Sequence, residues 1–170
     1  MTKLLRKFVL FVVFAGAITS VLKDATSSAT PISVNKDKEV SKILVEKSKK
    51  EMTLFDNNGE IIKTYKVRVG KNKGPKQCDG DKRTPEGIYH ITEKRDSKYH
   101  KFLAIDYPQV KDIKKAKELG CKPGDSIGIH SWIEGLPKEG SLGCITVWTK
   151  NEILEINNLV KVGTTVEIKE

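Results

Sequence analysis

The chain has 170 residues, of which 31% are charged and only 6% are aromatic, and its formal net charge is +9. This length suits one compact domain, because typical domains contain about 100 to 200 residues. Scattered lysines with few aromatic residues argue against a nucleic-acid-binding protein, so no nucleic-acid partner is expected. An anionic envelope polymer suits the charge better, and a solvated lysine-rich surface explains the charge alone equally well.

The first 22 residues have the organisation of an export signal. Lys3, Arg6 and Lys7 precede an apolar run at residues 8–22, and without these three cations the net charge is +6. The run of 15 residues is shorter than the roughly 20 that span a bilayer as a helix. A cleaved signal peptide and a retained anchor both stay open, and in either case the segment engages the membrane or the export machinery.

Small and polar residues dominate the next segment. Residues 23–40 therefore read as a linker, and the folded domain is expected at residues 41–170.

The domain begins with a pattern typical of a β-hairpin. Residues 42–48 and 51–56 are strand-like, and Asn58-Gly59 supplies the positive φ angles of a tight turn. Apolar residues of the segment 61–69, beginning with Ile61, then alternate with polar ones. This alternation predicts a strand with one buried face.

A glycine-rich basic loop at residues 70–80 interrupts the strand pattern. Two further short strands are predicted at residues 88–92 and 102–107.

The first predicted helix covers residues 112–119. It places Ile113, Ala116 and Leu119 on one side, and Gly120 stands where a C-terminal cap is expected.

The second helix has a clearer start, because Thr149 and Glu152 match a capping box. Its apolar side consists of Ile153, Ile156 and Val160. Alternating residues at 166–168 predict a closing strand. Many short strands with two short helices predict a mainly β (α+β) domain without an alternating parallel-sheet design.

Three cysteines in an exported chain leave at least one free thiol. Three pairings are open, and if Cys144 is catalytic then Cys78 with Cys121 is the remaining bridge.

A histidine and a cysteine in the second half of the chain form a candidate nucleophilic pair. His130 ends a strand-like segment, and Cys144 follows 14 residues later in a glycine-rich loop. A thiol with a pKa near 8.5 needs a base such as an imidazole to become a thiolate at neutral pH. Gly143 lets backbone N–H groups approach an oxyanion, and Ser141 is placed to orient the loop or the substrate.

The residues around this pair resemble the active-site motif of the YkuD-like L,D-transpeptidases, in which a histidine precedes Ser-x-Gly-Cys. The matching residues are Ile129-His130 and then Gly-Ser-Leu-Gly-Cys-Ile at 140–145. Upstream, Gly-Asp-Lys-Arg-Thr-Pro-Glu-Gly-Ile-Tyr at 80–89 resembles another block of that family. The resemblance covers about residues 41–170 and implies a β-sandwich or barrel-type domain.

The resemblance implies that Cys144 attacks a peptide carbonyl in the peptidoglycan stem, while His130 acts as general base and then general acid. Ser131 matches the position of a group that orients the imidazole. The thioester then passes to an amine, as in cross-linking or attachment of an envelope lipoprotein, or to water, as in an L,D-carboxypeptidase or amidase. No cofactor is implied, and the branch resembled is common in the periplasm.

One position departs from many members of the family, which carry an arginine two residues after the cysteine. Here Thr146 stands at that position, and no arginine follows Cys144. Thr146 and Ser141 are therefore candidate substrate-binding residues without a charge. Arg68 or Arg83 could replace the missing arginine as the partner of a substrate carboxylate, but the preferred interpretation of both is a surface charge.

Other classes of protein fit less well. A sortase also needs an arginine after its cysteine, and papain-like peptidases place the cysteine before the histidine. No close pair of ligands joins His90, His100 and His130 to the cysteines, so no metal site is expected. A non-catalytic wall-binding module stays open as the alternative that is not an enzyme.

Overall fold

The computed structural model describes residues 39–170. The expected export segment and most of the expected linker lie outside the described residues. Within residues 39–170, no helix combines the length and apolar character needed to cross a membrane.

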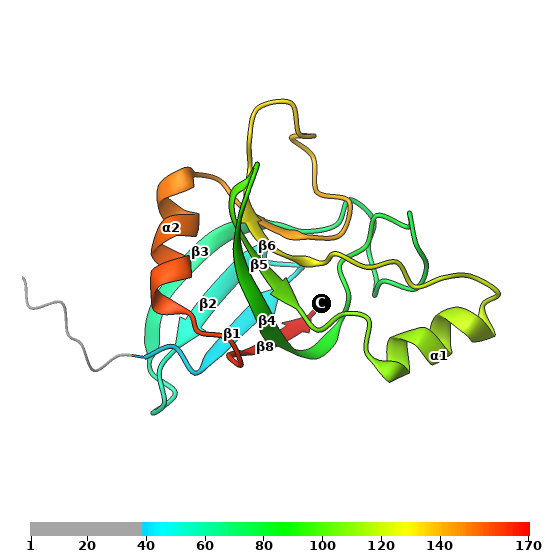
Figure 1. Ribbon diagram of the computed structural model, residues 1–170, viewed down its shortest axis with the longest axis horizontal. Helices are drawn as coiled ribbons and strands as arrows, with labels where there is room; N and C mark the ends of the chain where they lie inside the picture. Colours follow the sequence, from blue (N-terminus) through cyan, green and yellow to red (C-terminus); the bar gives the residue numbers. More distant parts are fainter. Residues whose placement is uncertain (1–38) are drawn as a thin grey trace, which may run out of the picture. The chain divides into compact units, whose positions relative to one another are not determined.

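Eight strands close into a barrel in the order β1-β2-β3-β7-β6-β5-β4-β8 (Figure 1). The strands are β1 (Lys42–Glu46), β2 (Glu51–Phe55), β3 (Ile61–Arg68), β4 (Gly87–Ser97), β5 (His100–Ile105), β6 (Gly128–Ser131), β7 (Ile145–Val147) and β8 (Thr165–Lys169). With the helices α1 (Val110–Glu118) and α2 (Lys150–Leu159), they confirm the predicted mainly β (α+β) fold.

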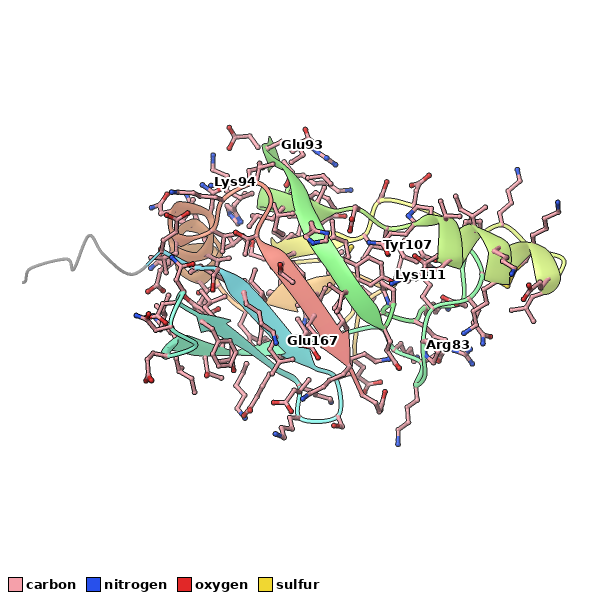
Figure 2. All side chains as sticks on the ribbon, turned by 90° about the horizontal axis from the view of Figure 1, so that it is seen from below. Arg83, Glu93, Lys94, Tyr107, Lys111 and Glu167 are labelled. Atoms are coloured by element: carbon pink, nitrogen blue, oxygen red, sulfur yellow. A yellow bond between two sulfur atoms is a disulfide. The ribbon has the colours of Figure 1, made fainter. Side chains whose placement is uncertain are left out.

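Two of the eight strand pairings are parallel. One joins β8 to β1, so that β8 lies between β1 and β4 (Figure 2). The other joins β6 to β7, whose connection arches above the barrel in Figure 1. The chain crosses back between β6 and β7, so that β7 begins beside the start of β6.

Helix α2 begins and packs as its sequence predicts. Thr149 Oγ1 accepts a hydrogen bond from the Glu152 N–H (3.2 Å), and the Glu152 carboxylate accepts one from the Thr149 N–H (2.8 Å). The capping box is therefore confirmed. The side chains that this helix buries against the barrel are those predicted, Ile153, Ile156 and Val160.

Helix α1 leaves most of its apolar side uncovered. Gly120 has the expected positive φ of 72°, but Ile113 and Leu119 are 49% and 54% exposed. Only Ala116 is buried, because the helix projects from the barrel on the side opposite α2 (Figure 1). The apolar side of this helix is therefore mostly exposed to solvent.

The prediction that Ile61 belongs to the buried face of its strand was wrong, since its side chain is 59% exposed. The pairing of β2 with β3 shifts at Leu54 and Phe55, so that Ile61 lies opposite Phe55. A β-bulge moves every residue beyond it to the other face of the strand.

The hairpin of β4 and β5 is longer than predicted. Residues 93–97 are too polar to give a strand signal, yet they pair with β5 as far as Ser97 opposite His100. The hairpin therefore extends beyond the barrel wall and carries Tyr99 and Phe102 toward the end of β6.

Candidate active site

Cys144 and His130 come together at the parallel pairing of β6 and β7. His130 lies opposite Thr146, and Ile129 lies opposite Ile145. Ile129 and Ile145 belong to the barrel core, so the alternate residues point outward. Cys144 and His130 both line one cavity of about 460 Å³ on this outer side.

The ring of His130 is held in one orientation and one tautomer. Its Nδ1 lies 2.8 Å from the carbonyl oxygen of Ser131, which can only accept, so Nδ1 carries a proton. The ring stacks on Tyr99 (4.2 Å between centroids) and on Phe102 (5.9 Å). These contacts leave Nε2 as the nitrogen that can accept a proton in the neutral imidazole.

Burial keeps His130 neutral. Its side chain is among the buried polar groups, at 5% exposure. Burial lowers the pKa of His130 below its ordinary value of 6.5, the Ser131 carbonyl opposes this change, and the charge of Arg68 adds to it. At neutral pH the imidazole is therefore a base with a free lone pair.

Ser131 acts on the imidazole through its backbone. Its hydroxyl donates to the carbonyl of Tyr99 (2.8 Å) and lies 2.8 Å from Nδ1 of His100. Because the single hydroxyl proton goes to Tyr99, His100 is the donor in the second contact. The serine side chain thus fixes the β4–β5 hairpin, while the carbonyl fixes His130.

The thiol of Cys144 is protonated at neutral pH. Burial raises the pKa of Cys144, and this outweighs the opposing effects of the Gly128 N–H and the Lys76 ammonium. The thiol donates to the carbonyl of Ser126, with Sγ 3.5 Å from the oxygen. The site thus pairs a neutral thiol with a neutral imidazole rather than a preformed thiolate with an imidazolium.

The loop before Cys144 places one backbone donor differently from the prediction. The Gly143 N–H already donates to Ser141 Oγ (3.0 Å), and the Ser141 hydroxyl donates to the carbonyl of Cys144. The oxyanion donor predicted at Gly143 is therefore engaged within the loop, as is the hydroxyl of Ser141. Within residues 39–170, the Cys144 N–H has no hydrogen-bond acceptor, which leaves it as the available donor.

Gly143 is required by its backbone rather than by a free N–H. Its φ is +143°, and a Cβ there would lie 2.9 Å from Ile127 Cδ1 and 3.0 Å from the Arg83 carbonyl oxygen. Any larger residue would be strained and would push the cysteine loop away from this support.

The block at residues 80–89 holds that loop in place through hydrogen bonds. Thr84 Oγ1 donates to the Gly143 carbonyl (2.8 Å) and accepts from the Gly70 N–H (2.7 Å). Asp81 accepts from the backbone N–H groups of Gln77, Cys78 and Arg83. This role of Thr84 was not predicted, although the block at residues 80–89 was the available signal.

Arg68 also belongs to this site, and its interpretation as a surface charge was wrong. Its side chain is 5% exposed and lines the same cavity as Cys144. Thr146 is buried between it and His130, since Arg68 pairs with Thr146 across β3 and β7. Arg83 instead lies partly buried, with Nη1 3.2 Å from Gln77 Oε1.

His90 and the other two cysteines have partners of their own, apart from Cys144 and His130. His90 lies beside Asp106 (3.2 Å), and Cys78 forms a disulfide with Cys121. Cys144 is therefore the one free thiol of the three cysteines in the sequence.

Comparisons with known proteins identify the family of the domain. The family model described as the YkuD L,D-transpeptidase catalytic domain matches residues 41–168. YafK of Escherichia coli (strain K12), whose name provisionally describes an L,D-transpeptidase, is 33% identical over 110 residues. That alignment covers 58% of this chain and 43% of YafK, so the chain spans less than half of its relative.

Solved structures give the same fold. The chain is similar to the helical cell shape determining protein Pgp2 of Campylobacter jejuni, at 25% identity and a TM-score of 0.62 over 79% of this chain and 49% of Pgp2. Bd1075 of Bdellovibrio bacteriovorus gives 26% identity and 0.58 over 78% and 48% of the two chains.

An Enterococcus faecium L,D-transpeptidase, in a C442S mutant form, shares the fold at 17% identity, with a TM-score of 0.52 over 78% of this chain and 50% of that one. Because the family model matches most of the chain, including the thiol, the imidazole and the block that supports them, the resemblance is confirmed and the chain belongs to the YkuD L,D-transpeptidase catalytic domain family.

Proposed function

We propose that this protein is a peptidoglycan-modifying cysteine L,D-transpeptidase, which forms a thioester with a stem peptide and passes the acyl group to an amine. The observation that carries the proposal is a neutral imidazole with a free Nε2 in the same cavity as the one free thiol. Membership of the family supports the choice of peptidoglycan stem peptides as substrates.

Acylation begins with proton transfer from the Cys144 thiol to His130 Nε2, because neither group is charged beforehand. The thiolate attacks the stem carbonyl, and the Cys144 N–H donates to the oxyanion that forms. His130 then gives its proton to the leaving amine as the C–N bond breaks. A thioester and a neutral imidazole remain.

Deacylation repeats the same steps with a new nucleophile. His130 takes a proton from an acceptor amine, which attacks the thioester and returns Cys144 to the thiol. A second stem gives a cross-link, and a lipoprotein lysine gives an attached lipoprotein. Water in place of the amine makes the same site an L,D-carboxypeptidase or amidase.

An exported location is part of the proposal. The N-terminal segment has the pattern of an export signal, and the Cys78–Cys121 disulfide suits an oxidising compartment such as the periplasm. The name of Pgp2 connects a similar fold with cell shape, and we propose the cell wall as the setting here too.

Mass analysis of muropeptides tests the function, with and without an added acceptor amine. The protein should convert stem tetrapeptides, and Cys144→Ala should reduce turnover by at least about 10³-fold, since no other thiol is free. New dimers identify transpeptidation, whereas hydrolysed stems without dimers identify a carboxypeptidase. Full activity of Cys144→Ala would overturn the proposal, and salt-sensitive binding of sacculi without conversion would identify a wall-binding module.

A further inference from the structure

Arg68 is a buried cation without an anion. Within residues 39–170, no carboxylate forms an ion pair with it. Its Nη1 donates to the carbonyl of Pro137 (2.8 Å), and its guanidinium lies over Trp132 (5.6 Å) and Trp148 (4.8 Å). Its Nε is buried and has no hydrogen-bond partner.

Such an arrangement is costly unless something else completes it. An arginine stays charged in a protein, and a buried charge normally has a counter-ion and a full set of hydrogen bonds. The Pro137 carbonyl and the two tryptophan rings meet only part of the hydrogen-bonding capacity and charge of the guanidinium. The missing partner is therefore expected to come from a molecule that enters the cavity.

The position of Arg68 indicates what that molecule is. Arg68, Thr146 and His130 lie in one row across β3, β7 and β6, and all three line the cavity of Cys144. Thr146 is small and uncharged, so it leaves the guanidinium room to reach this cavity. A substrate that fills this cavity would therefore reach both Cys144 and Arg68, so an anion bound by Arg68 would be a group of that substrate.

We propose that Arg68 binds a carboxylate of the stem peptide and so positions its scissile bond against Cys144. This rests on the proposed function. A guanidinium forms strong charge-assisted hydrogen bonds with a carboxylate, and the second terminal nitrogen, for which residues 39–170 provide no acceptor, can donate one to a ligand in the cavity. The carboxylate is either the C-terminus beyond the scissile bond or the side-chain carboxylate of the acyl-donor residue.

Binding to a catalytically silent protein tests the proposal without turnover. In the Cys144→Ala background, calorimetry measures the affinity for a stem tetrapeptide and for two analogues, amidated at the C-terminus or at the side-chain carboxylate. We expect one amidation to weaken binding about 10- to 100-fold. Which amidation does so identifies the carboxylate, and equal affinity for all three peptides would overturn the proposal.

Substitution of Arg68 should remove that discrimination. Arg68→Gln should weaken binding of the tetrapeptide about 10- to 100-fold while changing the affinity for the sensitive analogue less than threefold, and Arg68→Lys should be intermediate. If Arg68 only holds the loop through Pro137, both peptides lose affinity equally, and that result contradicts the proposal. If Arg68→Gln does not fold, the comparison of the three peptides in the Cys144→Ala protein that keeps Arg68 still decides the question.

Arg95 provides a matched control. It borders the same cavity, but its side chain is 46% exposed and already pairs with Glu93 (2.6 Å). Arg95→Gln should change the affinity for the tetrapeptide less than twofold, and a loss as large as that of Arg68→Gln would point to a general positive field and overturn the specific contact. If the protein with Cys144 intact does not convert the stem peptide, that result counts against the proposed function alone, because the binding test does not depend on turnover.

Discussion

At the scale of single residues, the site depends on two groups that burial keeps uncharged. A thiolate and an imidazolium would each lose solvation in this cavity, so the proton stays on sulfur until a substrate arrives. The Ser131 carbonyl fixes which imidazole nitrogen is protonated, and Thr84 fixes the Gly143 carbonyl. Each of these contacts involves a backbone carbonyl, which side-chain patterns do not reveal.

The raised pKa of Cys144 predicts slow alkylation at neutral pH. Because iodoacetamide reacts with the thiolate, the labelling rate of the folded protein should rise with a midpoint above the ordinary value of about 8.5. The same cysteine in urea should give a midpoint near that value. A rate already at its plateau at pH 7 would contradict the neutral pair.

The lowered pKa of His130 gives a matching expectation for turnover on the acid side. Activity needs the neutral imidazole, so it should persist as the pH falls through 6.5 and decline only below that value. A pH profile of kcat/KM checks this limb.

At the scale of elements, the two helices have similar apolar patterns but different environments. Ile153 of α2 is buried completely against the barrel, whereas Ile113 of α1 is half exposed. An amphipathic pattern indicates that a helix has an apolar face, but it does not say whether another element covers that face. The connections decide this, since α2 follows β7 directly and α1 lies in the long segment between β5 and β6.

The difference between the helices predicts unequal effects of one substitution. Ile153→Ala should lower the free energy of unfolding by about 2 to 5 kcal/mol, because it leaves a cavity in the core. Ile113→Ala should change it by less than about 0.5 kcal/mol, because that side chain already contacts solvent. Urea unfolding of the two variants measures both values, and equal losses would show that α1 packs on the domain in solution.

At the scale of the whole molecule, the disulfide joins the loop after β3 to the segment before β6. Both segments adjoin the site, since Thr84 supports the cysteine loop and Ser126 accepts from the thiol. The Asp79 N–H also donates to the carbonyl of Lys122 (2.7 Å) beside the bridge. The bridge therefore ties two segments that the barrel strands alone leave free.

Removal of the bridge should destabilise the protein. It closes a loop with a sequence separation of 43, so Cys78→Ser with Cys121→Ser should lower the free energy of unfolding by about 2 to 4 kcal/mol. Urea unfolding in oxidising buffer checks this. With dithiothreitol the two proteins should unfold at the same urea concentration, and coincidence already in oxidising buffer would contradict the prediction.

The sequence by itself determined the local features. The capping box of α2, the closing strand β8 and the cysteine between small residues each depend on neighbours within a few positions along the chain. The family resemblance also came from short blocks, and it predicted the barrel-type fold correctly. Local hydrogen bonds and alternation of apolar residues are physical constraints that a sequence displays directly.

Only the tertiary structure decided the environment of Arg68 and the register of β3. Alternation along β3 places Arg68 on the outer face, which usually meets solvent, but the connection of β6 to β7 covers that face here. Likewise, a bulge turned Ile61 outward. Burial depends on which distant segments pack together, so only the folded molecule shows that Arg68 is buried and lines the cavity of Cys144.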